Sequence, residues 1–237
     1  MTTLNEPYLS WFKAVVGRPP PPERSATCHD CPMCAARDFH PVLKCCTYIP
    51  ALTNAAVGKV LTRGGEGARR VRHQLDKGLG NGRWLQPSPH AEATYDRVHD
   101  QFGATRELRC PYVTEAGACS IWEDRNAICA TWFCQHDAGE QGAAMWDAAA
   151  DLFHFAEGGL AVLCEADTYE AAATASSTVT WTDLQAVGGE QLRRLEDALR
   201  DAASQLGMHP VTTNVGDMPC DHGEATADGQ HCTDELE

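Results

Sequence analysis

One stretch near the middle of the 237-residue chain carries four cysteines at irregular intervals. It reads Arg109-Cys-Pro-Tyr-Val-Thr-Glu-Ala-Gly-Ala-Cys119-Ser-Ile-Trp-Glu-Asp-Arg-Asn-Ala-Ile-Cys129-Ala-Thr-Trp-Phe-Cys134. Residues 109–113 and 118–122 predict at most a small β-hairpin around the turn at 114–117. We therefore expect irregular, cysteine-rich metal-binding loops here, set in a protein that is otherwise mainly α.

A second group of cysteines lies upstream, within residues 24–50. It contains a C-x2-C-x2-C triplet and, ten residues later, a Cys-Cys doublet. A C-x2-C pair lets two thiolates from one turn reach the same ion, and a triplet extends this to three ligands, as in many four-iron clusters. The nine predicted metal ligands of the two groups are Cys28, Cys31, Cys34, Cys45, Cys46, Cys110, Cys119, Cys129 and Cys134.

The high cysteine count favours metal ligation over disulfides. The chain has 12 cysteines but begins without the basic and apolar segments of a Sec-type export signal. We therefore expect a cytoplasmic protein, and a reducing cytosol keeps thiols free to bind metal.

The identity of the metal is less constrained than its ligands. The triplet favours an iron–sulfur cluster, most of all a 4Fe-4S cluster, that acts in redox or electron-transfer chemistry. Zinc is the alternative cofactor, in a structural or interaction module, because tetrahedral zinc sites use the same thiolates. A metal-dependent enzyme with an open coordination site, such as an iron-dependent oxidoreductase, is the third hypothesis. No P-loop, dinucleotide fingerprint or G-x-S-x-G motif assigns a catalytic residue.

Three side chains beside the second group are expected to surround the bound cofactor. Arg125 can donate hydrogen bonds to thiolate sulfur and offset the negative charge of a cluster. An ordinary salt bridge with the adjacent acidic residues explains this arginine equally well. Trp122 and Trp132, together with Phe133, are expected to form an apolar jacket that limits the access of water.

The remaining cysteines and some of the histidines are not expected to be main metal ligands. Cys164 lies in an apolar segment and predicts a buried helical thiol. His29 and His136 are interpreted as exposed loop histidines rather than ligands. The acidic stretch 211–237 is expected to be a mobile tail, and it holds four weaker candidate ligands. These are Cys220, His222, His231 and Cys232.

The second group resembles the YkgJ-type cysteine-cluster family, which is described as a zinc- or iron-chelating domain. The family pattern is Cys-Pro-aromatic, then Gly-x-Cys-Ser-Ile-aromatic, an acidic residue, an arginine and two cysteines. The residues that fall on its cysteines and arginine are Cys110, Cys119, Arg125, Cys129 and Cys134. Asn126 replaces the usual proline, and Ala130 replaces a basic residue. The resemblance covers residues 28–136 and implies metal binding without implying a reaction.

Hydrophobic periodicity predicts helices on both sides of the cysteine groups. The predicted helices are 7–16, 50–61, 66–77, 91–102, 140–156, 160–173 and 185–206, with the last helix proper starting near residue 190. We expect an N-terminal helix and Pro-rich spacer (1–23), a cysteine-cluster metal-binding domain (24–138), a helical region packed on it (139–210) and the tail (211–237).

Charge restricts the partners of the protein. The net charge is −14, and residues 126–237 hold 3 Lys and Arg against 20 Asp and Glu. This acidity disfavours nucleic acid, and no apolar stretch is long enough for a membrane span. We expect either a redox partner protein or a small-molecule substrate. The locally basic stretch 59–83 is a solvated helix face or an anion-binding patch.

Overall fold

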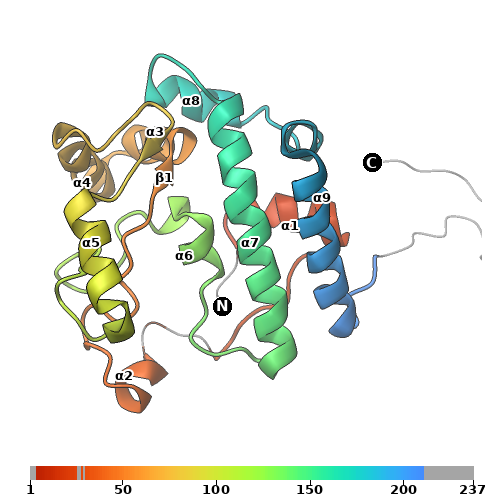
Figure 1. The fold of residues 1–237 in the computed structure, drawn as a ribbon, viewed down its shortest axis with the longest axis horizontal. Helices are drawn as coiled ribbons and strands as arrows, with labels where there is room; N and C mark the ends of the chain where they lie inside the picture. The colour runs from red at the N-terminus through yellow and green to blue at the C-terminus, as the bar shows by residue number, and fades with distance from the viewer. Residues whose placement is uncertain (1–3, 26–27, 29, 211–237) are drawn as a thin grey trace, which may run out of the picture.

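Helices dominate the computed structural model, which describes residues 4–25, 28 and 30–210 (Figure 1). Within these residues the only sheet is a two-stranded antiparallel pair, so the prediction of a mainly α protein is confirmed. The helices are α1 (Tyr8–Val16), α2 (Pro32–Ala36), α3 (Asn54–Arg63), α4 (Gly65–Asp76), α5 (Pro89–Val98), α6 (Ala127–Thr131), α7 (Gly139–Leu163), α8 (Tyr169–Ser176) and α9 (Trp181–Gln205). The short elements are β1 (Leu52–Thr53), β2 (Trp84–Leu85) and the 3-10 turns η1 (His99–Gln101) and η2 (Trp122–Asp124).

The larger hydrophobic core lies between α1, α6, α7 and α9. Figure 1 shows α7 running from the top to the bottom of the view, with α9 beside it and α1 crossing behind them. Phe12 of α1, Leu152 of α7 and Leu199 of α9 are fully buried in this core. Burying one such side chain contributes about 1.5–3 kcal/mol. The N-terminal helix is therefore held by the same apolar contacts as the C-terminal helices.

A second core joins α3, α4 and the β1–β2 pair to the second cysteine group. Val57, Leu85, Cys110 and Ile121 are buried together in it. Gly67 of α4 approaches the cysteine loop so closely that a Cβ there would lie 2.4 Å from the carbonyl oxygen of Ser120. The loop is therefore packed directly on α4.

The predicted break between helices 140–156 and 160–173 is wrong, because α7 continues through Gly158 and Gly159 to Leu163. A Cβ on Gly159 would lie 3.2 Å from Val187 and 3.3 Å from Leu184. This glycine thus permits the close approach of α9 rather than ending the helix.

Two helix starts also differ from the prediction. The helix expected from residue 50 begins at Asn54, because residues 52–53 pair with 84–85 and the Thr53 side chain caps α3 by accepting from Ala56 N. The last helical stretch begins at Trp181 rather than at residue 185, but the predicted start of the helix proper near residue 190 is confirmed, because the stretch consists of two helices joined at a kink. At Gly189, where φ is 56°, this helix is kinked.

The hairpin expected in the second cysteine group is reduced to one bridge between Val113 and Cys119. The turn between them forms as expected, since Thr114 N donates to Ala118 O at 2.8 Å. The two-stranded sheet lies elsewhere and pairs β1 with β2. The short loop is held by packing on α4 more than by strand pairing.

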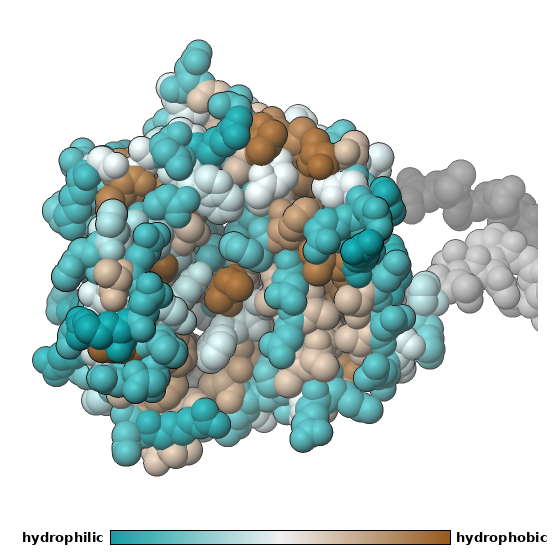
Figure 2. All heavy atoms as spheres, viewed as in Figure 1, coloured by the Kyte–Doolittle hydropathy of each residue, from teal (hydrophilic) through white to brown (hydrophobic). Residues whose placement is uncertain are grey.

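Figure 2 shows a mainly hydrophilic face, with apolar surface gathered near the end of α7 that lies beside α8. Val162 and Leu163, at that end of α7, are exposed. Among the described residues, no helix combines the length and apolarity of a membrane span. The predicted tail (211–237), with its four candidate ligands, lies outside the described residues, as does His29.

Candidate metal centre

The second cysteine group is fixed by side chains at both of its ends. Asn126 caps α6, and its Oδ1 accepts a hydrogen bond from Cys129 N at 3.1 Å. This places Cys129 in the first turn of α6. The N-terminus of α6 is also tied to α7, because Ala127 N donates to the buried carboxylate of Glu157 at 3.0 Å.

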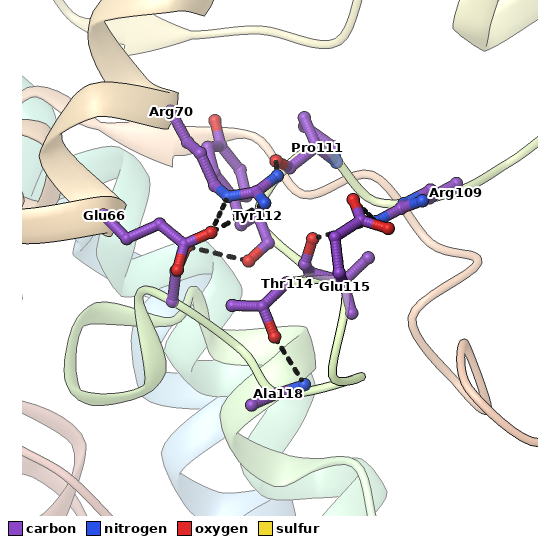
Figure 3. Close-up of polar contacts among 10 residues, drawn as sticks. Glu66, Arg70, Arg109, Pro111, Tyr112, Thr114, Glu115 and Ala118 are labelled. Atoms are coloured by element: carbon purple, nitrogen blue, oxygen red, sulfur yellow. Dashed lines mark hydrogen bonds and ion pairs between the residues drawn. The ribbon is translucent and has the colours of Figure 1, made fainter.

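The loop between Cys110 and Cys119 is held from α4. Figure 3 shows Arg70 reaching from α4 to the loop, where it donates to the carbonyl oxygen of Pro111 at 3.0 Å and pairs with Glu66 at 2.7 Å. On the same loop Arg109 pairs with Glu115 at 2.8 Å. These contacts fix the loop without using its thiols, which stay available as ligands.

A backbone hydrogen bond joins the two cysteine groups directly. Cys110 N donates to Cys46 O at 2.9 Å, although the two residues are far apart in the sequence. The doublet of the first group and the first cysteine of the second group are therefore neighbours. The sequence predicted that these cysteines are metal ligands but left open whether the two groups would form one site or two.

A second link, which the sequence did not reveal, lies at the other end of the site. The Asp137 carboxylate accepts hydrogen bonds from Arg24 N at 2.8 Å and Ser25 N at 3.0 Å. In return Glu23 accepts from Asp137 N at 2.7 Å and from Trp146 Nε1 at 2.5 Å. We call these contacts the Glu23–Asp137 clamp. It holds the chain before the first cysteine group against the chain after the second.

Electrostatic contacts show how the thiols of the first group are arranged. Hydrogen bonding to Cys45 raises the pKa of Cys28. For Cys45 the bond from Cys28 lowers the pKa, but the bond to Cys46 and desolvation outweigh it and bring the pKa to about 12. Desolvation and hydrogen bonding to Cys31 raise the pKa of Cys34. The first group thus forms a chain of neighbouring thiols.

The second group interleaves with this chain. Desolvation raises the pKa of Cys129 well above its usual value, and repulsion from Cys110, Cys119 and Cys45 raises it further. Desolvation also raises the pKa of Cys134, followed by repulsion from Cys31. All nine predicted ligands therefore lie in one connected region of the structure, rather than in two separate ones.

The region has ligands of the right chemistry but is not closed around an ion. All ten cysteines in the described residues are free thiols. In that part of the chain, no three His, Cys, Asp or Glu side chains are arranged to hold a metal ion. The soft thiol donors fit iron–sulfur, iron or zinc. Drawing the thiols onto a metal requires local movement of the loops.

Arg125 is the charged residue inside this region. It is 8% exposed, its guanidinium lies 3.5 Å from the centroid of the Trp122 ring, and its Nε donates to Trp122 O at 2.9 Å. Its Nη2 atom is buried and has no hydrogen-bond partner among the described residues. Desolvation lowers the pKa of Arg125, and Cys119, Cys129 and Cys28 act in the opposite direction.

The adjacent acids do not neutralise Arg125. Asp124 pairs with Arg63, and Glu123 lies 3.3 Å from the same arginine. In the described part of the chain Arg125 forms no salt bridge, so the salt-bridge interpretation of this residue is wrong. The buried cation faces thiols instead.

The aromatic jacket is partial. Trp122 is 41% exposed and Trp132 is 50% exposed, although Phe133 is buried against Trp146. Trp122 lies against the Arg125 guanidinium, and the Trp132 ring meets Phe102 at 5.2 Å. The two indoles therefore cover parts of the region without sealing it from water.

Two minor assignments have different outcomes. Cys164 is fully buried in the larger core, as predicted, but it is the C-cap that follows α7 rather than a helical residue, and its carbonyl accepts from Asn54 Nδ2. His136 was expected to be an exposed loop histidine, which is wrong. Its Nδ1 is buried and lies 3.8 Å from Glu23 in the Glu23–Asp137 clamp.

Two tyrosines next to the site were not predicted. Tyr8 donates to Glu157 at 2.6 Å and to Arg125 O at 3.0 Å. Desolvation and the proximity of Cys129 raise the pKa of Tyr48 to about 12, and the Asn126 side chain interacts with its hydroxyl. The only sequence signal for Tyr48 is its position two residues after the cysteine doublet.

Comparison of the chain with known protein families, curated proteins and solved structures finds no match. The resemblance to the YkgJ-type family therefore rests on the residues of the second cysteine group and stays a prediction.

Proposed function

We propose that the protein binds a metal cluster through its cysteine thiolates, as an iron–sulfur protein with 4Fe-4S the first candidate, in redox or electron-transfer chemistry. The observation that supports this most is Arg125, a buried cation whose Nη2 atom has no partner and whose electrostatic neighbours are Cys28, Cys119 and Cys129.

The physical argument concerns the charge of the site. Neutral thiols leave a buried guanidinium uncompensated, and an unpaired buried charge costs several kcal/mol. Metal binding removes the thiol protons and supplies negative charge close to Arg125. Donors aimed at cluster sulfur also tune an iron–sulfur centre. The buried, uncompensated charge of Arg125 therefore supports the proposal that these thiols bind metal as thiolates.

The thiols nearest Arg125 come from both cysteine groups. Cys28 belongs to the first group, whereas Cys119 and Cys129 belong to the second. Cys45 lies beside Cys28 and also acts on Cys129. We infer that these four thiolates are the ligands of the first metal site and that the other five cysteines form a second site or serve as alternative ligands. A bound iron–sulfur cluster supplies one-electron chemistry, and the loops and indoles restrict the access of water to it.

We also propose a cytoplasmic location, since the ten described cysteines are all free thiols and a reducing compartment keeps them so. The partner is then a redox protein or a small-molecule substrate that approaches the half-exposed indoles.

The deciding experiment is purification without oxygen, followed by an absorption spectrum and analysis of iron, sulfide and zinc. A brown protein with broad visible absorbance and stoichiometric sulfide is expected. A colourless protein with stoichiometric zinc and no iron would overturn the iron–sulfur proposal in favour of a zinc module. Cys129→Ser is expected to lose metal, whereas Cys164→Ser, the matched control in the larger core, is expected to keep it.

A further inference from the structure

A cavity lies where α5 passes the segment that follows the cysteine doublet. Its volume is about 230 Å³. Leu108 and Ile49 give it an apolar floor, and Tyr48 and Tyr95 also line it. Glu92 and Asp96, one helical turn apart on α5, line it as well and are exposed to solvent. The lining combines aromatic rings, aliphatic side chains and negative charge.

The two tyrosines that line the cavity form an edge-to-face pair. Their ring centroids are 6.4 Å apart and the ring planes meet at 75°. The face of an aromatic ring carries negative electrostatic potential, and tyrosine attracts a cation placed within about 6 Å of its centroid. The cavity therefore offers aromatic surface beside its carboxylates, which suits a compact cationic group.

The carboxylates add to this preference. Glu92 and Asp96 take part in no salt bridge within the described residues, whereas Arg97 on the same helix is paired with Glu107 at 2.8 Å. Like charges four residues apart on a helix repel each other and destabilise it slightly. A cation bound between them relieves that repulsion. The charge of the cavity therefore selects against anions.

The volume limits the size of the ligand. At about 230 Å³ the cavity is smaller than the roughly 300–1,000 Å³ of pockets that hold drug-sized ligands. We propose that it binds a small organic cation of the ammonium class, with apolar groups packed on Leu108 and Ile49 and the charge between the tyrosines and carboxylates.

The cavity adjoins the cysteine region through one side chain. Tyr48 follows Cys46 by two residues, and its hydroxyl interacts with Asn126, the cap of the helix that carries Cys129. A ligand in the cavity thus lies beside the proposed metal centre. The cation site is formed by its own lining, however, and does not depend on the identity of the metal.

Calorimetric titration with choline at low ionic strength tests this proposal. The comparison ligand is 3,3-dimethyl-1-butanol, which has the same shape without the charge. We expect choline to bind at least tenfold more tightly than the neutral compound, because only choline gains from the carboxylates and ring faces. Equal binding of the two compounds, or no binding of choline at millimolar concentration, overturns the proposal.

Matched variants test whether choline binds in this cavity or is attracted by the negative charge of the whole protein. The double variant Glu92→Gln/Asp96→Asn is expected to weaken choline binding at least tenfold. The control is Asp147→Asn/Asp151→Asn, another exposed pair of acids one turn apart on α7 and outside the cavity, and its affinity should be unchanged. Equal weakening in both double variants refutes a localised site.

The aromatic contribution has its own pair of variants. Tyr95→Phe keeps the ring and is expected to retain binding, whereas Tyr95→Leu is expected to lose it. Tyr95 is partly exposed, so circular dichroism of each variant should match the parent. Retention of choline affinity in the leucine variant contradicts the ring-face interaction.

Discussion

Replacing Glu23 by alanine tests whether the two halves of the candidate centre are held together by the Glu23–Asp137 clamp. Glu23 is only 2% exposed, and its two carboxylate oxygens accept from Asp137 N and Trp146 Nε1. Leaving a buried donor unsatisfied costs about 1–3 kcal/mol, so two lost acceptors predict a loss of about 2–6 kcal/mol in the free energy of unfolding. Urea unfolding followed by tryptophan fluorescence measures this loss.

Glu23→Gln should have a stability between those of the parent protein and Glu23→Ala. Its amide oxygen can still accept one of the two hydrogen bonds, but its NH2 group faces the second donor, so a loss of about 1–3 kcal/mol is expected. Glu140→Ala, an exposed acid at the start of α7, is the matched control and should change stability by less than about 0.5 kcal/mol.

The clamp also has a consequence for the metal. Glu23 is not a proposed ligand, yet the clamp fixes residues 23–25, which precede Cys28 in the sequence. We therefore expect the alanine variant to retain less metal than the parent even under conditions where both are folded. Unchanged stability together with unchanged metal content would refute the clamp as the element that aligns the two cysteine groups.

Three further predictions address packing and pH. Gly67→Ala should destabilise the protein by about 1–3 kcal/mol in urea unfolding, since its Cβ would lie 2.4 Å from Ser120 O. Gly158→Ala, which has open space around it in α7, should stabilise the protein by about 0.5–1 kcal/mol in the same assay. Hydrogen bonding to Glu157 raises the pKa of His154. The contribution of this pair to stability is therefore complete below the unfolded-state pKa near 6.5 and disappears as the pH rises through the higher folded-state pKa. His154→Gln should flatten the dependence of thermal stability on pH between pH 6 and 8, and an unchanged pH profile would argue against the pair. The thiol pKa values are raised in the metal-free protein, so binding releases protons and apparent metal affinity in chelator competition should increase from pH 6 to pH 8; an affinity independent of pH would contradict thiolate ligation.

The α-helices show where sequence reasoning succeeds and where it stops. Apolar spacing predicted α1, and the glycine pair before a basic segment predicted α4, both to within a residue or two of their ends. The same reasoning split α7 at Gly158 and Gly159, because local propensity treats a glycine pair as a break. In the structure Gly159 accommodates α9, a contact between residues distant in the sequence. Such a contact leaves no local signal.

Arg125 illustrates the same limit at the candidate site. Its position between cysteines was equally compatible with a salt bridge and with a role beside thiolates. In the structure the neighbouring Asp124 turns toward Arg63 on α3, which argues against its salt bridge with Arg125, and the role beside thiolates stays a proposal. The choice of partner depends on the packing of α3 against η2, which no sequence spacing encodes.

The sequence by itself determined the mainly α class and the nine cysteines proposed as ligands, because helical periodicity and C-x2-C spacing are local properties of the chain. Only the tertiary structure decided that the two cysteine groups meet in one region, that Arg125 lies buried among their thiols and that a cavity adjoins them. The physical reason is that these features depend on long-range contacts, namely the Cys110–Cys46 backbone bond, the Glu23–Asp137 clamp and the packing of the cysteine loop on α4. Those contacts are selected by the burial of two hydrophobic cores, not by the spacing of neighbouring residues.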